Sequence, residues 1–406
     1  MHNYRMLGRT GEGTFSEVLR CQCLADSKYY ACKKMKQRYD SIDQVNKIRE
    51  IQALRKLNPH PNIIGLKEVI FDPRTGVLAL IFELMEMNIY ELIKDRRTYL
   101  SESRVKLYMW QLIKSLYHMH RHGIFHRDVK PENILLKKDV LKLADYGSCR
   151  SMYSRQPYTE YISTRWYRAP ECLLTDGYYS HKMDLWSAGC VLYEIMTLRP
   201  LFPGSNELDQ ISRIHDVLGT PSSGVLDKFR VHQSRCMNFN FPPKSGTGLS
   251  SLFKSISPTC LDLLSKLCTY DPDERISGKT ALWHPYFKDF REAEERARVG
   301  KSPAVDERQS SVYPRRRHYH RSHRSHHGYS GTVSHMASES TKLPPILPEA
   351  SKPALSLHNR ASAKMFPAVT QHHQHQQKQQ RTHHKRQEGS TFYLPALGKH
   401  NSHPEL

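Results

Sequence analysis

The stretch from His126 to Glu171 constrains this chain more than any other part of its sequence. It opens with the string His-Arg-Asp-Val-Lys-Pro-Glu-Asn at residues 126–133, continues with Asp-Tyr-Gly at 145–147 and Thr-Glu-Tyr at 159–161, and closes with Ala-Pro-Glu at 169–171. In that order it carries a candidate proton acceptor, two candidate metal ligands, a loop that can be phosphorylated and an anchor for that loop. The eight-residue string followed by Asp-aromatic-Gly is too specific for chance, and it predicts one composite site.

Composition divides the chain into two parts. The chain has 406 residues, a formal net charge of +21 and a hydrophobic fraction of 38%, which is below the roughly 45–50% of an ordinary globular protein. Residues 291–406 hold 19 Lys or Arg and 9 Asp or Glu, a net charge of +10. We therefore expect the first part to fold, a charged extension over 288–298, and a disordered, basic, His-, Gln- and Pro-rich tail over 299–406.

Cysteine usage and the lack of export signals predict the setting of the chain. All nine cysteines lie between Cys21 and Cys268 without a Cys-x-x-Cys pair, which indicates buried free thiols in a reducing compartment. We read no secretory signal and no run near the ~20 apolar residues that cross a bilayer. A cytoplasmic location is expected, with the nucleus and the cilium left open. The basic tail could meet nucleic acid, acidic proteins or anionic membrane, and simple solvation is an equal alternative.

Apolar periodicity predicts strands first and helices afterwards. Residues 4–35 are expected to form strands joined by a Gly-bearing turn, and residues 77–82 a further strand. The pattern over 102–121 is strongly amphipathic, whereas 184–196 is apolar nearly all round, as in a helix buried in a large core. Helices are expected over 43–57, 102–121, 184–196, 207–218 and 258–268.

A Gly-rich turn and a lysine–glutamate pair point to phosphate binding. Residues 11–18 read Gly-Glu-Gly-Thr-Phe-Ser-Glu-Val, and the two glycines let the backbone approach phosphates closely. Taken alone, such a pattern is more often a plain β-turn. Lys33 lies on the predicted strand that follows this turn. Glu50 shares a helix face with Leu54 and Leu57, and an inward carboxylate needs a partner. We predict that Lys33 pairs with Glu50 while facing phosphates.

Taken together, these motifs resemble those of a protein kinase. Residues 4–287 look like a complete kinase domain, and the segments 159–161, 164–171 and 184–190 are similar to the mitogen-activated and cyclin-dependent (CMGC) branch, within it to the male-germ-cell-associated kinase subfamily. The resemblance implies an α+β, bilobal fold with a small β-rich N-lobe and a larger helical C-lobe. It also implies an ATP- and Mg²⁺-dependent serine/threonine kinase of signal transduction that acts on protein Ser or Thr followed by Pro.

The resemblance assigns a role to each matching position. Asp128 would accept the proton of the attacking hydroxyl, and Lys130 would contact the transferring phosphate. Asn133 and Asp145 would hold Mg²⁺, which prefers such oxygen ligands. Lys33 and Glu50 complete the catalytic set. The ATP-binding residues would be Gly11, Glu12, Gly13, Thr14, Phe15, Ser16, Val18, Ala31, Lys33, Phe82 as gatekeeper, and Glu83 and Met85 in the hinge.

The resemblance also implies a phosphorylation switch. Thr159 and Tyr161 would be the regulatory phosphosites, and an upstream activating kinase would be a partner. Arginine suits phosphate because its planar fork binds oxygens in pairs. The helix ahead of Arg49 lacks the cyclin-binding signature, so cyclin is not expected as a partner. Arg49, Arg127 and Arg150 would receive the phosphate of Thr159, Arg165 and Arg168 that of Tyr161, and Glu171 would pair with Arg275.

Two departures from the family pattern keep alternatives open. Ser16 replaces the third glycine of the turn, and Tyr146 stands where Phe is usual, so its hydroxyl needs a partner if it is buried. A pseudokinase scaffold is the main alternative, against which the complete set of catalytic residues argues. Tyrosine specificity is a second alternative, although Lys130 after Asp128 favours Ser/Thr. Nucleic-acid binding through the tail is a third, not expected as the main role.

Overall fold

A five-stranded antiparallel sheet forms most of the N-terminal lobe. The computed structural model describes residues 3–159, 164–232 and 239–299. The sheet has the strand order β1-β2-β3-β5-β4, and the predicted strands over 4–35 and 77–82 are all present in it. Its strands are β1 (Tyr4–Glu12), β2 (Ser16–Cys23), β3 (Tyr29–Met35), β4 (Leu66–Asp72) and β5 (Val77–Glu83).

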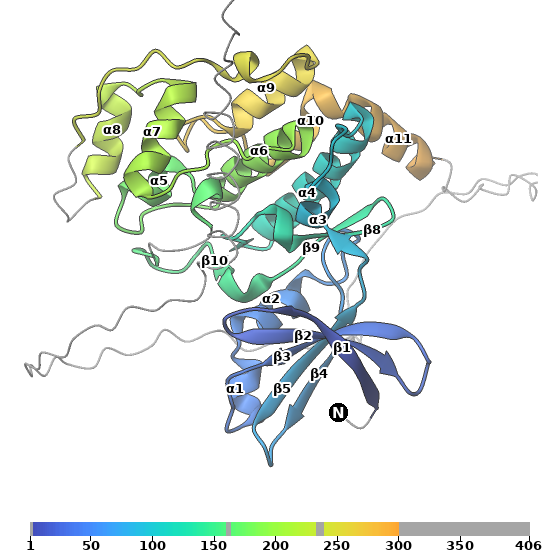
Figure 1. The fold of residues 1–406 in the computed structure, drawn as a ribbon. Helices are drawn as coiled ribbons and strands as arrows, with labels where there is room; N and C mark the ends of the chain where they lie inside the picture. Colours follow the sequence, from blue (N-terminus) through green and yellow to red (C-terminus); the bar gives the residue numbers. More distant parts are fainter. Residues whose placement is uncertain (1–2, 160–163, 233–238, 300–406) are drawn as a thin grey trace, which may run out of the picture. The chain divides into compact units, whose positions relative to one another are not determined.

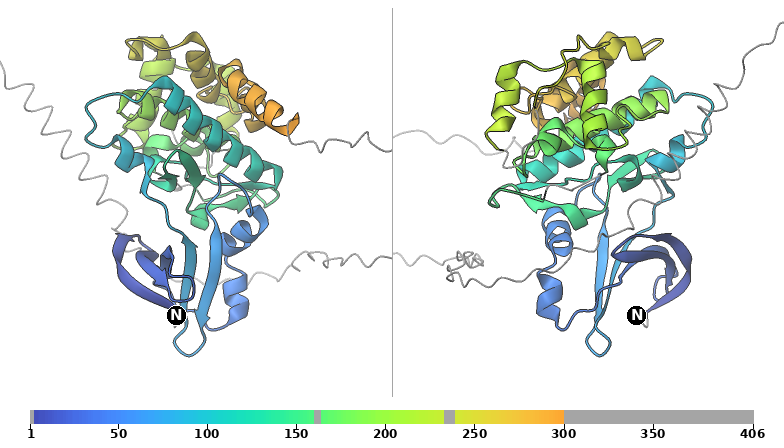
Figure 2. Two further views of the ribbon diagram at one scale, coloured as in Figure 1. Left: turned by 90° about the vertical axis from the view of Figure 1, so that its right-hand side faces the viewer. Right: turned by 60° about the vertical axis from the view of Figure 1, so that its left-hand side comes forward.

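Helices α1 (Ile42–Asn46) and α2 (Arg49–Leu57) lie on one side of this sheet (Figures 1 and 2). The prediction of one continuous helix over 43–57 is wrong. The backbone is extended at Ile48 (φ −65°, ψ 122°), which is the N-cap of α2. Ile48 packs its side chain against the core from that conformation, so a tertiary contact overrides the local helical pattern. The inward face of α2 survives the break, since Glu50 is buried on it.

Two long helices form the centre of the C-terminal lobe. Helices α4 (Glu102–Arg121) and α6 (Lys182–Thr197) pack against each other. The predicted apolar stripe of α4 is buried, and α6 is buried nearly all round. Both predictions from periodicity are therefore confirmed, as are the helices over 207–218 and 258–267. The other helices are α3 (Ile89–Ile93), α5 (Pro170–Leu174), α7 (Glu207–Leu218), α8 (Ser223–Arg230), α9 (Pro258–Leu267), α10 (Gly278–Trp283) and α11 (Lys288–Val299).

Short strands position the segments that carry the motifs. The string 126–133 lies between β7 and β8, and Asp145 follows β9 directly. One parallel bridge, Ile63 to Leu143, joins the loop after α2 to the end of β9. The strands are β6 (Met87–Asn88), β8 (Ile134–Lys137) and β9 (Val140–Leu143) in one sheet, and β7 (Ile124–Phe125) with β10 (Arg150–Ser151) in another.

The charged segment 288–298 lies within α11, which packs on α4. Phe290 stacks on Trp110 with ring centroids 5.9 Å apart. Glu294 Oε1 accepts hydrogen bonds from Lys114 Nζ at 2.6 Å and from Trp110 Nε1 at 3.3 Å. The extension is thus held to the C-terminal lobe by an aromatic contact and by polar contacts.

The described cysteines behave as their spacing predicted. Eight of the nine lie in the described ranges, and all eight are buried and unpaired. Within the same ranges, no helix is both long enough and apolar enough to pass through a bilayer.

Candidate active site

Lys33 lies between two carboxylates that come from different lobes. Its Nζ donates to Glu50 Oε1 at 2.7 Å, to Glu50 Oε2 at 3.0 Å and to Asp145 Oδ1 at 3.0 Å. The predicted pair of Lys33 with Glu50 is present, and the three acceptors match the three N–H donors of an ammonium group. The arrangement links β3, α2 and the segment after β9 in one contact.

The charges of Lys33 and Asp145 reinforce each other, whereas burial and the nearby Asp145 raise the pKa of Glu50. Burial lowers the pKa of Lys33, but Asp145 and Glu50 outweigh it, so the pKa of Lys33 is raised overall. Burial raises the pKa of Asp145, but Lys33 outweighs it and the pKa falls below its usual range. Lys33 therefore stays cationic and Asp145 anionic, because each is stabilised by the other.

Asp128, Lys130 and Asn133 form the second part of the site. Asp128 Oδ2 accepts from Asn133 Nδ2 at 2.9 Å and contacts Lys130 Nζ at 3.0 Å. Asn133 Nδ2 also donates to the Asp128 carbonyl at 2.8 Å. Among the described residues, the buried Oδ1 of Asp128 has no hydrogen-bond partner. Leaving a buried acceptor without a donor costs free energy. Since no described group donates to this oxygen, it is available to accept the proton of a hydroxyl group.

Asp184, for which the sequence reasoning assigned no role, positions the backbone of the segment around Asp128. Its carboxylate accepts from the amides of His126 and Arg127, each at 2.8 Å, and contacts His120 Nε2 at 2.9 Å. Arg127 has a left-handed backbone with φ 68°, which is uncommon outside glycine and needs such support. The signal was in the sequence: a carboxylate at the start of a helix that is apolar nearly all round must have partners.

Tyr146 is fully buried beneath Asp145. Its hydroxyl donates to the Leu143 carbonyl at 3.2 Å, and its ring meets the His126 ring edge-on with centroids 5.3 Å apart. The predicted need for a partner is met. Tyr146 therefore fits the site as a packed aromatic residue.

The Gly-rich turn and the hinge frame the space above Lys33. In the turn, Gly13 N donates to Ser16 O at 2.8 Å, and Phe15 is 76% exposed. Ser16 is buried, so it fills space where glycine is usual. Glu12 pairs with Lys36 at 2.8 Å. The remaining predicted ATP-binding residues lie on or beside the same sheet. Gly11 pairs with Val18 across β1 and β2, and Ala31 pairs with Phe82 across β3 and β5. Thr14 lies in the turn, Glu83 ends β5, and Met85 follows β5.

The side chain of Glu83 is engaged by groups of the protein itself. Its Oε1 accepts from Gly65 N at 2.7 Å and pairs with Lys142 Nζ at 2.8 Å. The side chain therefore stabilises the hinge region from behind.

Of the three arginines predicted to receive the phosphate of Thr159, Arg127 and Arg150 approach the start of the Thr-Glu-Tyr loop. Arg127 Nη1 donates to Tyr179 Oη at 3.0 Å, and Tyr179 Oη donates to the Thr159 carbonyl at 2.7 Å. The Arg150 guanidinium lies 5.1 Å from the centre of the Tyr158 ring, and the exposed Arg49 lies across from Cys149, whose Sγ is 4.0 Å from the Arg49 carbonyl. In the described part of the chain none of the three pairs with a carboxylate.

The other two arginines face α7. Arg165 Nη1 donates to the Ser205 carbonyl at 3.0 Å, and Arg168 Nη1 pairs with Glu207 at 3.0 Å. Tyr161, which was predicted to carry the phosphate that these arginines receive, lies outside the described residues. The structure therefore gives the positions of Arg165 and Arg168 alone.

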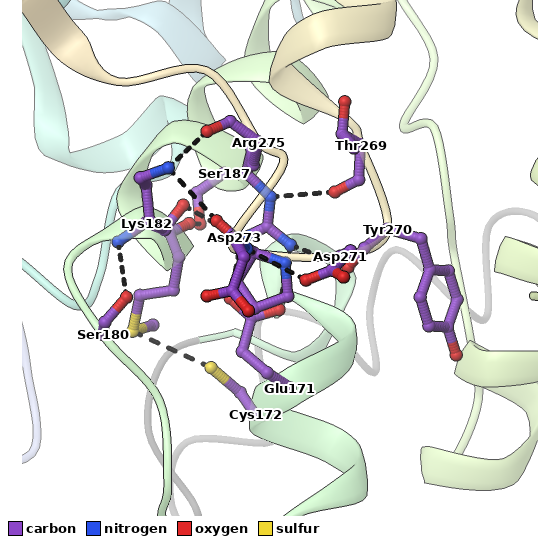
Figure 3. Close-up of polar contacts among 12 residues, drawn as sticks. Glu171, Cys172, Ser180, Lys182, Ser187, Thr269, Tyr270, Asp271, Asp273 and Arg275 are labelled. Carbon is purple, nitrogen blue, oxygen red and sulfur yellow. Dashed lines mark hydrogen bonds and ion pairs between the residues drawn. The ribbon is translucent and has the colours of Figure 1, made fainter. Parts of the chain in front are cut away.

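Glu171 and Arg275 form the predicted ion pair (Figure 3). The two nitrogens Nη1 and Nη2 donate to the two carboxylate oxygens at 2.6 and 2.9 Å. Both side chains are almost fully buried, with 0% and 2% exposure. The pair joins α5 at the end of the loop to the turn before α10.

The comparison with known families agrees with this site. The protein kinase domain model matches residues 4–287. The chain therefore belongs to the protein kinase family, whose members use ATP and a divalent metal ion.

Its relatives define the class more narrowly. The chain is 67% identical to the MAPK/MAK/MRK overlapping kinase of Homo sapiens, over 73% of this chain and 70% of that protein, and equally identical to the Mus musculus protein over 72% and 70%. It is 42% identical to the serine/threonine-protein kinase ICK of Mus musculus, over 71% of this chain and 45% of that protein. The chain is a serine/threonine protein kinase of the CMGC group.

Proposed function

We propose that this chain is a Mg²⁺-dependent, proline-directed kinase of signal transduction, activated by phosphorylation of Thr159 and Tyr161. The observation that carries the proposal is the convergence of Lys33, Asp128 and Asp145 in one site, with Asp128 Oδ1 buried and unpartnered among the described residues. A scaffold without activity has no use for a buried carboxylate oxygen that lacks a donor.

Asn133 and Asp145 are the residues that would hold the metal. Both donors of Asn133 Nδ2 point to Asp128, which leaves its Oδ1 as an acceptor for a cation. Asp145 uses Oδ1 toward Lys33 and its side chain is half exposed. An amide oxygen and a carboxylate oxygen suit Mg²⁺, which, once bound with ATP, neutralises charge on the phosphates.

The other residues of the site bind and orient. Lys33 would hold the phosphates beneath the Gly-rich turn, while Glu50 keeps the lysine in place. Asp128 Oδ1 would accept the proton of a substrate hydroxyl, and Lys130 would face the transferring group. Burial lowers the pKa of Lys130, but Asp128 outweighs it and raises the pKa overall, so the charge needed beside a phosphate persists.

The switch is proposed from an uncompensated charge. Arg127 is only 3% exposed and pairs with no carboxylate of the described residues, and a buried guanidinium without a counter-ion is unfavourable. A phosphate on Thr159 would bring about −1.5 to −2 charges to a residue that Tyr179 already links to Arg127. Phosphorylation would thus stabilise the loop, and an upstream kinase is the proposed partner.

Substrate preference is proposed from the group, and location from the cysteine usage of the chain, rather than from the site. Proline after the target residue is proposed because the chain belongs to the CMGC group. Cyclin is not proposed as a partner. We propose a cytoplasmic location, with nucleus and cilium as further compartments, and nucleic acid only as a secondary partner of the tail.

Phosphate transfer by the purified full chain tests the proposal. With labelled ATP and Mg²⁺, a Ser-Pro peptide should be phosphorylated at least about 10-fold faster than the matched Ser-Ala peptide. Asp128→Asn and Asp145→Ala should each lower kcat by about 100-fold or more. Asp227→Ala, on a surface ion pair with Arg230, is the matched control and should not change the rate. Equal turnover by wild type and Asp145→Ala would refute the proposed kinase mechanism.

The loop is tested separately. Incubation with cell extract should place phosphate on Thr159 and raise the rate, and Thr159→Ala should prevent the rise. An undiminished rise in that variant would show that the switch lies elsewhere.

A further inference from the structure

The backbone conformation of Asp145 is uncommon for a residue other than glycine, although aspartate adopts it more readily than most. Its backbone is left-handed, with φ 62° and ψ 79°, a region that non-glycine residues occupy where their surroundings enforce it. In this conformation its Oδ1 lies 3.0 Å from Lys33 Nζ. The groups that hold the following turn, Tyr146–Ser148, therefore also hold the carboxylate.

Three contacts hold this turn. Arg127 Nε donates to the Ser148 carbonyl at 2.7 Å. The Cys149 amide donates to the Tyr146 carbonyl at 3.1 Å. The third contact is the Tyr146 side chain, which is fully buried, with its ring against His126 and its hydroxyl on the Leu143 carbonyl. A phenylalanine would keep the ring contact and lose the hydroxyl contact.

The carbonyl that receives the Tyr146 hydroxyl is itself held firmly. The Leu143 oxygen also accepts from the Ile64 amide at 3.0 Å, and the Leu143 amide donates to the Asn62 carbonyl at 2.9 Å. Asn62 in turn donates to Gln111 of α4 at 2.8 Å. The hydroxyl therefore connects the turn to a point fixed by both the loop after α2 and helix α4.

We propose that Tyr146 is a positioning residue, whose hydroxyl holds the turn and so keeps Asp145 in the left-handed conformation in which it faces Lys33. Its consequence for the reaction rests on the proposed function, because that function makes Asp145 a metal ligand. The family's usual Phe lacks this hydrogen bond, so the inference concerns a residue particular to this chain.

The size of the effect follows from the hydrogen bond. At 3.2 Å the bond is longer than the ~2.7–2.8 Å typical of a hydroxyl donor, so its strength lies at the lower end of the range for buried hydrogen bonds. Tyr146→Phe leaves no orphaned group, because Leu143 O keeps the Ile64 amide. We expect the open form of the turn to become about threefold more populated, about 0.7 kcal/mol at roughly 1.4 kcal/mol per factor of ten.

Cys149 reports directly on that opening. Its thiol is buried at 2% exposure, and burial raises its pKa to about 12, so alkylation requires the segment to move. In the full chain, iodoacetamide should label Cys149 about threefold faster in Tyr146→Phe than in wild type, as resolved by peptide mass spectrometry. Cys172 and Cys260, buried in the C-terminal lobe, should react at the wild-type rate.

Tyr286→Phe is the matched control. It removes the hydroxyl of another fully buried tyrosine, on the turn before α11. Because that hydroxyl contacts Cys260, Cys172 is the reference here, and the labelling of Cys149 relative to Cys172 should be unchanged. Acceleration of all three thiols together in Tyr146→Phe would indicate general loosening and overturn the proposal. So would an unchanged rate at Cys149.

Nucleotide affinity separates this inference from the proposed function. Wild type should bind ATP more tightly with Mg²⁺ than with EDTA, and Tyr146→Phe should lose about threefold of that gain while its affinity in EDTA stays the same. An undiminished gain in Tyr146→Phe refutes the positioning role. A wild type without any gain refutes the proposed metal role of Asp145, whereas the labelling of Cys149 still decides the role of Tyr146.

Discussion

The buried pair of Glu171 and Arg275 offers a sharp test of how the C-terminal lobe is stabilised. All five N–H groups of Arg275 have acceptors. Besides the two bonds to Glu171, it donates to the carbonyls of Thr269 at 2.9 Å, Lys182 at 3.0 Å and Tyr270 at 3.2 Å. Arg275→Met therefore leaves a buried carboxylate without its counter-ion and removes the arginine donor from three carbonyls.

The expected costs of the two single changes differ. Breaking a buried ion pair by removing one partner lowers the free energy of unfolding by about 3–5 kcal/mol. Because Arg275→Met also loses the backbone contacts, we expect a cost at the upper end of this range, about 5 kcal/mol. Glu171→Gln keeps the three backbone acceptors of Arg275 and one oxygen, so about 2 kcal/mol is expected.

The double variant decides whether the pair acts as a unit. With both charges removed, Glu171→Gln with Arg275→Met should cost about 4 kcal/mol, since the unpaired carboxylate is gone and mainly the carbonyl contacts are lost. We would measure urea unfolding of the full chain at 25 °C, comparing midpoints at a common slope. Additive costs within about 0.5 kcal/mol would refute the reasoning, because contacting partners must couple.

Three further predictions concern charge. Lys33→Met should lower kcat/KM for peptide phosphorylation by about 100-fold or more with an unchanged circular dichroism spectrum, since the cation between two carboxylates is lost; wild-type activity would contradict its role. Burial raises the pKa of Glu194 to about 8 from 4.5, so between these pH values the unfolded chain binds fewer protons than the folded chain. The stability contributed by this group should therefore fall as pH rises from 4.5 to 8. Glu194→Gln should remove this pH dependence from the urea unfolding midpoints. Burial lowers the pKa of His60, His181 and His215 to about 4 from 6.5, so between these pH values the unfolded chain binds more protons than the folded chain. Stability should therefore fall as pH drops from 6.5 to 4. His215→Gln should make this fall shallower, and an unchanged fall would show that His215 does not contribute to it.

Local patterns predicted elements well where the pattern and the packing agree. The stripe of α4 and the all-round apolar character of α6 are dictated by burial, so periodicity sufficed. The break at Ile48 was missed, because it depends on a contact of that side chain with the core rather than on neighbours in the sequence. Periodicity has no access to such a contact.

The candidate site divides in the same way. The identity of Lys33, Glu50, Asp128 and Asp145 was readable because phosphate and metal chemistry restricts the residue types and their order. The part played by Asp184 was not, since a helix start and a loop 58 positions apart in the chain come together only in the folded lobe.

The sequence alone determined the family and predicted the chemistry and the residues that would carry it, because each motif is a run of neighbours whose spacing is preserved in any fold. Only the tertiary structure decided the partners. It showed that Tyr146 donates to the Leu143 carbonyl, that Arg127 reaches Thr159 through Tyr179, and that Asp128 keeps one oxygen unpartnered among the described residues. Hydrogen bonds and ion pairs depend on distances of a few tenths of an ångström between groups that folding alone brings together.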